Sequence, residues 1–267
     1  MRNLLLIALF FFSIATVNAQ MDDKFYYPKK LKTIQIDSLT YKERSFIIDK
    51  DTLNSIIILA KNNPAKALIL YFHGAGGNLI NYVKYIKPLV NNNYDVMMID
   101  LRGYGKSTGK PTHISNSTDA QFILNAIVTD KTFGNKKIIV YGASMGTQVA
   151  THLAKNNQDK ITALVLDGTI SSFTDIALDK TPKAQHTIIN QYVTSPYAAK
   201  EDIKEIKKMP VLFIHSKTDK DVPYSQAEIV YANAKTKKFL WIYEGNHLMA
   251  PIVNSLDFIK NVDNLLQ

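Results

Sequence analysis

The sequence contains no cysteine among its 267 residues. A disulfide bond, a thiolate metal site and a cysteine nucleophile are therefore excluded, and so is a lipidated N-terminal cysteine. The six histidines include no H-x-x-x-H pair, and no G-x-G-x-x-G segment occurs in the chain. Because the zinc-protease and dinucleotide-binding signatures are both missing, we expect the protein to bind no metal ion and no cofactor.

The sequence also lacks concentrated charge and, after its N-terminus, long apolar runs. The formal net charge is +9, but the lysines are scattered, with no arginine-rich tract and no run of five like charges. Scattered lysine is typical of a soluble surface, so we expect no nucleic-acid partner. Beyond the N-terminus no uncharged apolar run approaches the roughly 18 residues that a membrane span needs. We therefore expect no stable membrane insertion of the mature chain.

Residues 1–19 are similar to a secretory signal peptide. Arg2 supplies a positive charge, and the apolar run from Leu4 to Val17 is too short to span a bilayer comfortably. Small residues stand at the positions that a signal peptidase reads. We expect cleavage after Ala19, which leaves residues 20–267 as a mature protein that is exported, to the periplasm or as a secreted protein. An uncleaved membrane anchor and a buried N-terminal helix are the alternatives.

The pattern of apolar residues predicts an α/β fold in one domain. From Thr33 to about Ala60 the chain reads as short β-branched strands, and beyond Lys66 continuous apolar runs alternate with amphipathic helices. This alternation predicts a mostly parallel sheet covered on both faces, with the early strands as an antiparallel N-terminal edge. Residues 171–209 are more than one crossover needs. We expect them to form a small helical cap at the carboxyl ends of the strands, where ligands bind.

A serine stands where a predicted strand turns into a predicted helix. Gly142 and Gly146 flank Ser144 in the pattern G-x-S-x-G. These glycines remove Cβ atoms that would collide where a strand and a helix pack around so sharp a turn. The start of the helix also directs backbone N–H groups toward the serine. We therefore predict that Ser144 is a nucleophile rather than a small residue of an ordinary turn.

A serine hydroxyl is a poor nucleophile until a base takes its proton, and the base needs an orienting acid. His247 follows the last predicted core strand and lies in a loop at the same edge of the sheet as Ser144. We predict His247 as the base. The other histidines lie before or within helices, in the insertion, or at strand ends beside residues that suggest other roles: His73, His113, His152, His186 and His215.

Three aspartates are candidates for the orienting acid. Asp219 lies in a loop after a predicted strand and before the helix that Val222-Pro223 should open. Asp221 immediately precedes that helix, so we expect it to cap the helix or brace the loop. Asp167 ends the strand that follows the serine. We predict Asp219 as the acid and keep Asp167 as the alternative.

The order Ser144, Asp219, His247 is that of the α/β-hydrolases. With the segments HGAGGN, DLRGYGKSTG, GASMG, HSKTDKDVP and GNH, the chain resembles the serine hydrolases grouped around monoacylglycerol lipases and serine aminopeptidases, particularly members with a small cap. The resemblance covers most of the chain from about Ser45 and implies the α/β-hydrolase fold.

The resemblance also assigns roles to residues near the predicted nucleophile. It implies that the backbone N–H groups of Ala75 and Met145 form an oxyanion hole, while His73 braces the loop. The sequence departs from the family at Asp167, where relatives are often non-acidic, and at Ser216, where glycine is common. The first departure leaves the acid open, and the second alters the loop that holds the predicted acid.

We expect a serine hydrolase that cleaves carboxylic esters of small to medium substrates through a Ser-His-Asp triad and an acyl-enzyme. An exported serine peptidase similar to aminopeptidases is the alternative, followed by a non-catalytic binding protein on the same scaffold. The partner would be a small-molecule ester or peptide. Four residues of the insertion either line an acyl pocket or pack the cap onto the sheet: Ile188, Ile189, Tyr192 and Tyr197.

Overall fold

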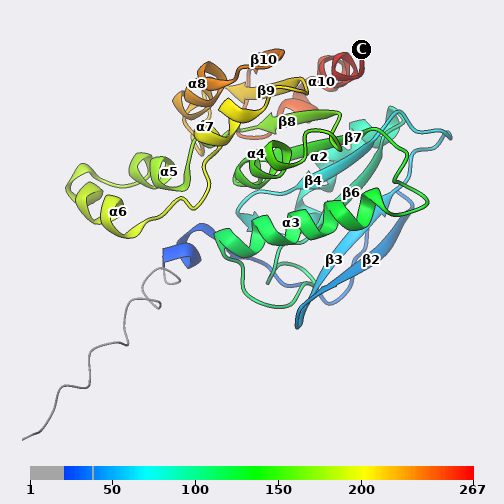
Figure 1. The fold of residues 1–267 in the computed structure, drawn as a ribbon, viewed down its shortest axis with the longest axis horizontal. Helices are drawn as coiled ribbons and strands as arrows, with labels where there is room; N and C mark the ends of the chain where they lie inside the picture. The colour runs from blue at the N-terminus through cyan, green and yellow to red at the C-terminus, as the bar shows by residue number, and fades with distance from the viewer. Residues whose placement is uncertain (1–20, 38) are drawn as a thin grey trace, which may run out of the picture.

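An eight-stranded sheet forms the centre of the protein (Figure 1). The structure is a computed structural model, and it describes residues 21–37 and 39–267. The predicted signal peptide, residues 1–19, lies outside the described residues. The strand order is β10-β9-β8-β7-β4-β6-β3-β2. The strands are β2 (Tyr41–Ile48), β3 (Asp51–Ile58), β4 (Leu68–Phe72), β6 (Asp95–Ile99), β7 (Ile138–Ala143), β8 (Ala163–Asp167), β9 (Val211–Ser216) and β10 (Lys238–Tyr243).

The strand directions agree with the predicted sheet. Neighbouring strands from β6 to β10 are parallel, whereas β3 pairs antiparallel with both β6 and β2. The parallel strands β4, β6, β7, β8 and β9 are buried along their whole length, which explains their unbroken apolar sequence. The expectation of a strand as early as Thr33 is wrong, because the first strand of this sheet begins at Tyr41.

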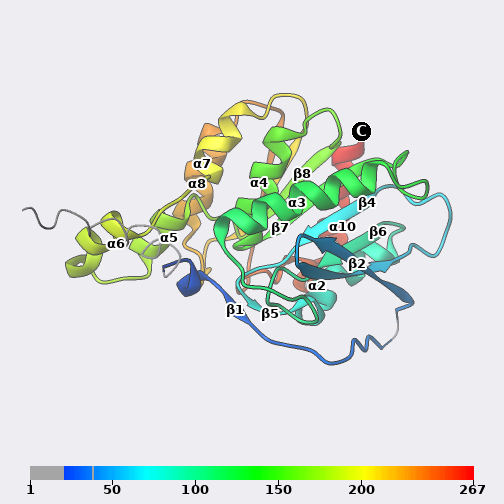
Figure 2. The same ribbon diagram turned by 60° about the horizontal axis from the view of Figure 1, so that its bottom comes forward.

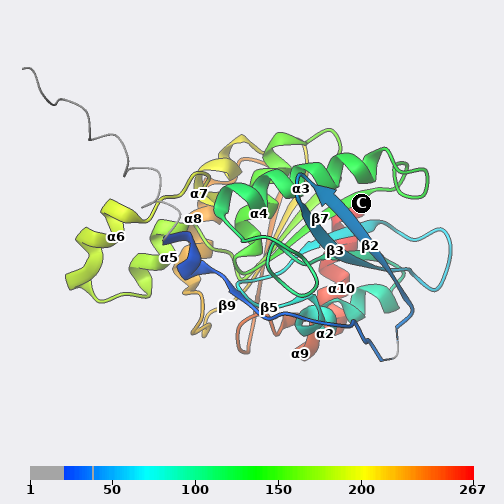
Figure 3. The same cartoon turned by 90° about the horizontal axis from the view of Figure 1, so that it is seen from below.

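Helices cover both faces of the sheet (Figure 3). One face packs against α2 (Leu79–Asn91), α9 (Ala250–Val253) and α10 (Ser255–Asp263). The other packs against α3 (His113–Val128), α4 (Gly146–Asn156), α7 (Ala199–Asp202) and α8 (Tyr224–Asn233). Within the described ranges 21–37 and 39–267, none of the helices has the length and hydropathy that crossing a membrane requires.

The last predicted helix is divided in the structure. The sequence pattern predicts one helix near residues 252–266, but α9 ends at Val253 and α10 begins at Ser255. Asn254 separates them with a non-helical backbone, φ −147° and ψ 71°, and its side chain accepts a hydrogen bond from the Asp257 N–H. The asparagine therefore caps a new helix. A 3₁₀ turn, η4 (Asn264–Leu266), follows α10.

The segment between β8 and β9 carries several helices. These are α5 (Phe173–Asp179), η2 (Lys183–Gln185), α6 (His186–Tyr192), α7 and η3 (Ile203–Glu205). Of these, α5 and α6 project at one end of the molecule (Figures 1 and 2). Helices near residues 187–193 and 201–207 are predicted, whereas α5 is not. We call α5 and α6 the cap helices.

The described chain also begins at the cap end. Here lie η1 (Asp23–Phe25) and β1 (Tyr27–Pro28), which pairs in parallel with β5 (Gly76–Gly77). The early chain therefore runs beside the carboxyl ends of the sheet before it enters β2.

Candidate active site

Ser144 occupies a sharp turn between β7 and α4. Its φ is 55°, a left-handed conformation that costs free energy in a non-glycine residue, and its N–H donates to the carbonyl oxygen of Asp167 at 2.7 Å. The positions on either side of the turn leave no room for a Cβ atom, so both must be glycine. A Cβ atom on Gly142 would lie 2.6 Å from the Gly146 carbonyl oxygen, and one on Gly146 would lie 2.2 Å from that of Phe72. The turn thus holds the serine side chain above the sheet.

His247 and Asp219 form a hydrogen-bonded pair. The His247 Nδ1 atom lies 2.6 Å from Oδ2 of Asp219, whose side chain is 1% exposed. The other carboxylate oxygen accepts backbone N–H groups of Asp221 and Val222 at 2.8 and 2.9 Å. Burial raises the pKa of Asp219, but hydrogen bonds and the charge of His247 outweigh it, so the pKa lies below its ordinary value. The carboxylate therefore stays ionised beside the imidazole.

Two further contacts fix the loops that carry this pair. Ser216 lies at the end of β9, and its Oγ donates to the Gly245 carbonyl oxygen at 2.6 Å, which joins the Asp219 loop to the His247 loop. Nε2 of His215 donates to the Val222 carbonyl oxygen at 3.0 Å. Ser216, one of the two positions at which the sequence departs from the family that it resembles, thus bridges the two loops.

Gly168 is a site residue that the sequence analysis does not identify. Its φ is 65°, and a Cβ atom there would lie 2.5 Å from Cε1 of His247. The backbone of Gly168 therefore forms a surface against which the imidazole packs. A glycine directly after the last residue of a core strand is the signal that could have found it.

The alternative acid, Asp167, has a different partner. Its Oδ2 accepts the Tyr141 hydroxyl at 2.7 Å, and Oδ1 is buried with no hydrogen-bond partner among the described residues. Burial raises the pKa of Asp167 to about 7. The structure thus hydrogen-bonds His247 to Asp219 and places Asp167 behind the site, against the core.

Ala75 and Met145 lie beside Ser144 and line the same pocket. Within residues 21–37 and 39–267, neither backbone N–H has a hydrogen-bond acceptor. The Ala75 carbonyl oxygen accepts two donors, the Tyr27 N–H at 2.9 Å and the Tyr104 hydroxyl. These bonds fix the peptide that joins Ala75 to Gly76. Because neither the Ala75 nor the Met145 N–H has an acceptor within the residues that the structure describes, both have the capacity to bind an anionic oxygen.

The other histidines have partners away from Ser144. His73 is buried, its Nδ1 donates to the Gly74 carbonyl oxygen at 2.7 Å, and burial lowers its pKa to about 4. His152 bonds Asp202 at 2.7 Å, and His186 bonds the Thr181 carbonyl oxygen at 3.2 Å. His113 is the first residue of α3 rather than part of a loop. The contacts of His73, His152 and His186 give these three rings structural roles.

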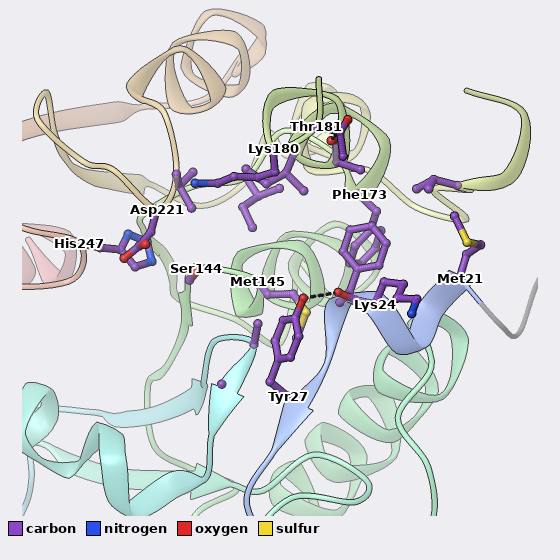
Figure 4. Close-up of a pocket in the computed structure, with 18 of the residues that line it drawn as sticks. Met21, Lys24, Tyr27, Ser144, Met145, Phe173, Lys180, Thr181, Asp221 and His247 are labelled. Atoms are coloured by element: carbon purple, nitrogen blue, oxygen red, sulfur yellow. Dashed lines mark hydrogen bonds between the residues drawn. The ribbon is translucent and has the colours of Figure 1, made fainter. Parts of the chain in front are cut away.

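A pocket of about 680 Å³ opens at Ser144 and His247 (Figure 4). Figure 4 shows both residues near one end of it and Met21 at the other. The residues between β8 and β9 that line it are largely apolar: Ile170, Phe173, Ile176, Ala177, Ile189 and Val193. Four lining residues precede β2, namely Met21, Lys24, Phe25 and Tyr27, and the sequence analysis assigns none of them to the site.

The four insertion residues considered from the sequence divide between two roles. Ile189 is buried and lines the pocket, while Ile188 and Tyr192 are exposed on α6. Tyr197 packs the insertion onto the body, because it is buried and its hydroxyl donates to the His113 carbonyl oxygen at 2.9 Å.

Asp221 lines the pocket instead of capping α8, whose N-cap is Pro223. In the described part of the chain, no group of three His, Asp or Glu residues is placed to hold a metal ion.

Comparisons with known proteins agree with this architecture. Residues 67–185 match the α/β hydrolase fold family. The chain is 34% identical over 195 residues to protein bem46 of Schizosaccharomyces pombe, covering 72% of this chain and 65% of that protein. It is 29% identical over 192 residues to lysophosphatidylserine lipase ABHD12 of Danio rerio, covering 65% of this chain and 48% of that protein. The chain thus spans less than two thirds of either relative.

The esterase Pf2001 of Pyrococcus furiosus has a similar solved structure. The TM-score is 0.71 with 20% identity, and the match covers 90% of this chain and 98% of that one. At this identity the likeness concerns the fold. The predicted fold class, a mostly parallel sheet with an antiparallel edge, is confirmed.

Proposed function

Because the chain belongs to the α/β-hydrolase superfamily, we propose that it is a serine hydrolase that cleaves carboxylic esters of small to medium size. One observation carries the proposal. Ser144, held at a strained strand-to-helix turn, lines the same pocket as His247, whose Nδ1 bonds the buried Asp219 carboxylate. A nucleophile, a base and an orienting acid are thus supplied in the chain order of this superfamily.

In the first half of the reaction, Oγ of Ser144 attacks the ester carbonyl carbon while His247 takes the hydroxyl proton. Asp219 fixes the imidazole tautomer and stabilises the imidazolium. The negative charge that forms on the carbonyl oxygen is met by the N–H groups of Ala75 and Met145, each worth about 3 kcal/mol in such sites. When the carbon–oxygen bond breaks, His247 returns the proton to the leaving alcohol.

In the second half, water hydrolyses the acyl-enzyme. His247 takes a proton from water as its oxygen attacks the acyl carbon, and the proton returns to Ser144 as the carboxylic acid leaves. The apolar walls of the pocket suit the acyl group. Its volume of about 680 Å³ exceeds what an acetyl group needs and falls within the range of small-molecule sites.

Replacement of the nucleophile tests the proposal. Ser144→Ala should lose reaction with a fluorophosphonate probe and lower kcat toward p-nitrophenyl esters by about 10⁶-fold. Ser117→Ala, which changes a serine of α3 outside the pocket, should keep both properties. Unchanged hydrolysis by the Ser144 variant would refute the mechanism. Full labelling of the wild type without turnover of any substrate would favour a binding protein.

Peptide hydrolysis is the second candidate function, and one residue favours it. Asp221 is the only carboxylate among the described residues that line the pocket together with Ser144 and His247. A carboxylate in this position could bind the α-ammonium group of a peptide. Aminoacyl-p-nitroanilides test this alternative: turnover that Asp221→Asn removes would support it, and turnover of esters alone would exclude it.

A further inference from the structure

The described chain begins inside the pocket. We call residues Met21–Pro28 the N-terminal arm. Four of its eight residues, Met21, Lys24, Phe25 and Tyr27, line the pocket with Ser144 and the cap helices. In Figure 4 the Tyr27 ring stands beneath the cap residue Phe173, with its hydroxyl bonded to the Lys24 carbonyl oxygen. The arm therefore forms a wall of the pocket, opposite the cap.

One end of the arm is bonded to the loop that carries the proposed oxyanion donor. The Tyr27 N–H donates to the Ala75 carbonyl oxygen at 2.9 Å, and the Lys29 N–H donates to that of Gly77 at 2.7 Å. These bonds form the β1–β5 ladder. The Tyr104 hydroxyl bonds the same Ala75 oxygen and accepts the Tyr27 N–H at 3.1 Å. The aromatic wall is thus held at a fixed position relative to Ser144.

The other end is bonded to the first residue of α3, and we call these contacts the His113 clasp. Asp22 accepts the His113 backbone N–H at 2.9 Å, and its second oxygen lies 3.2 Å from Nε2 of His113. The Tyr26 hydroxyl bonds Nδ1 of the same ring at 2.7 Å. Both ring nitrogens therefore lie against polar atoms of the arm. Burial lowers the pKa of His113 to about 3, so the ring is neutral.

The clasp also contacts the cap. The His113 ring stacks on Phe173, the first residue of α5, with centroids 3.5 Å apart and planes inclined by 16°. Phe25 lies edge-on to both rings, at 5.1 Å from His113 and 5.6 Å from Phe173. His113, Tyr26 and Phe173 are all at most 5% exposed. One buried aromatic cluster therefore fixes the arm and the cap relative to each other.

We propose that the N-terminal arm is the specificity element of this site: Phe25 and Tyr27 form the wall that selects medium-length acyl chains, and the His113 clasp sets the position of that wall. The proposal rests on the proposed hydrolase function and deepens it by assigning the acyl-binding wall. An acetyl group is the shorter acyl chain and offers little apolar surface for the arm rings to contact. A chain of about eight carbons extends along the apolar pocket toward Met21 and loses apolar contact when an arm ring is removed.

Substrates of different acyl length test the arm. In Phe25→Ala and in Tyr27→Ala, kcat/KM for p-nitrophenyl octanoate should fall about tenfold, while kcat/KM for the acetate should stay within about twofold of the wild type. Tyr27 is 63% exposed, so its replacement leaves the fold intact. Asp22→Ala should produce the same selective loss, because it releases the clasp.

Asp23→Ala is the matched control. Asp23 adjoins the clasp, but its carboxylate faces Lys110 at 3.7 Å with both side chains at least half exposed, and it does not line the pocket. Its acyl-length profile should equal that of the wild type. An equal change in the acetate and octanoate rates of the Tyr27 variant would overturn the proposal, because a general loss of structure or positioning would then explain it.

Calorimetric binding of octanoate separates this proposal from the proposed function. The affinity should weaken about tenfold in Tyr27→Ala and Asp22→Ala and remain unchanged in Asp23→Ala. If the wild type hydrolyses neither ester but the variants still weaken octanoate binding, the arm is the acyl wall and the hydrolase assignment is wrong. Equal octanoate affinities in wild type and Tyr27→Ala would refute the role of the arm even if esters are hydrolysed.

Discussion

At the scale of single residues, two aspartates near the base differ in their surroundings. The Asp219 carboxylate accepts hydrogen bonds from the His247 imidazole and from two backbone N–H groups, and these bonds keep it ionised despite burial. The Asp167 carboxylate accepts one hydrogen bond, from the Tyr141 hydroxyl, and is otherwise enclosed by the core. An ionised carboxylate in hydrogen-bond contact is what orients an imidazole base.

This difference predicts unequal effects of the same substitution. Asp219→Asn should lower kcat by about 10⁴-fold, because an amide cannot stabilise the imidazolium and favours the wrong tautomer of His247. Asp167→Asn should lower kcat by less than about tenfold, since its amide oxygen still accepts the Tyr141 hydroxyl. Kinetics on a p-nitrophenyl ester decide the matter. The reverse order of effects would place the acid one strand earlier.

The buried Asp167 also predicts a dependence of stability on pH. Its folded pKa of about 7 lies above the value of about 3.9 in an unfolded chain. Between these values the unfolded chain releases a proton that the folded protein keeps, so the Asp167 contribution to the free energy of unfolding is largest below pH about 4. It declines as the pH rises to about 7 and is constant above that.

Asp167→Asn should remove this contribution, so that stability falls less, or rises more, between pH 5 and 7 than in the wild type. Urea denaturation at several pH values within this interval measures the slope. Asp159→Asn, at a position 82% exposed, should retain the wild-type slope. Parallel curves for the wild type and the Asp167 variant would contradict the assignment of a raised pKa to this residue.

At the scale of elements, the loops at the carboxyl ends of β7, β8 and β9 assemble the site. The β7 loop carries Ser144, the β9 loop carries Asp219, and the β8 loop contributes Gly168, whose backbone supports the His247 ring. Because the strands are parallel and adjacent, their loops meet at one edge of the sheet.

We therefore expect that position 168, in the loop after β8, tolerates no side chain. Gly168→Ala should lower kcat by about 10² without unfolding the protein, because the new Cβ displaces a ring that must stay within hydrogen-bond reach of the nucleophile. The left-handed φ adds about 1 kcal/mol of strain. Steady-state kinetics with a thermal melt check both parts. Wild-type kcat in a folded variant would show that the imidazole can move without cost.

The sequence predicts the sheet and the residues around the serine because their signals are local. Unbroken apolar runs predict the parallel strands, and the glycines around Ser144 predict the turn. Asp219 and His247 follow from their places after predicted strands, and the choice of Asp219 over Asp167 remains a prediction that kinetics must test. What the structure adds there is the 2.6 Å contact between them.

The pocket walls were not predictable in the same way. Asp22 and Tyr26 have no periodic pattern that connects them with His113, because their partner lies 91 and 87 residues away in the chain. The adjacent Ile188 and Ile189 look alike in sequence, yet only Ile189 faces the pocket. Such contacts depend on how α3, the arm and the cap helices come together in three dimensions.

At the scale of the whole molecule, the N-terminal arm relates the site to the predicted export of the protein. Met21, the first described residue, already lines the pocket. Cleavage after Ala19 would therefore keep every described residue of the pocket in the mature chain. We propose export to the periplasm or the medium.

Expression of the full sequence in a bacterial host tests this proposal. Intact-mass analysis of the periplasmic or secreted fraction should give a chain that begins at Gln20, with or without cyclisation of that glutamine. The cytoplasmic fraction should contain little protein of that mass. A cytoplasmic chain that retains Met1 would refute both the cleavage and the location.

The His113 clasp has a consequence for how the protein is made. A ribosome adds about 5–20 residues per second, so the arm, synthesised among the first residues, waits several seconds before its partner 91 residues later exists. During that interval Phe25 and Tyr26 lack the His113 ring that they contact in the folded protein, and they are available to a chaperone that binds aromatic segments. The first part of the pocket to be synthesised thus depends on partners that are made later, in α3 and α5.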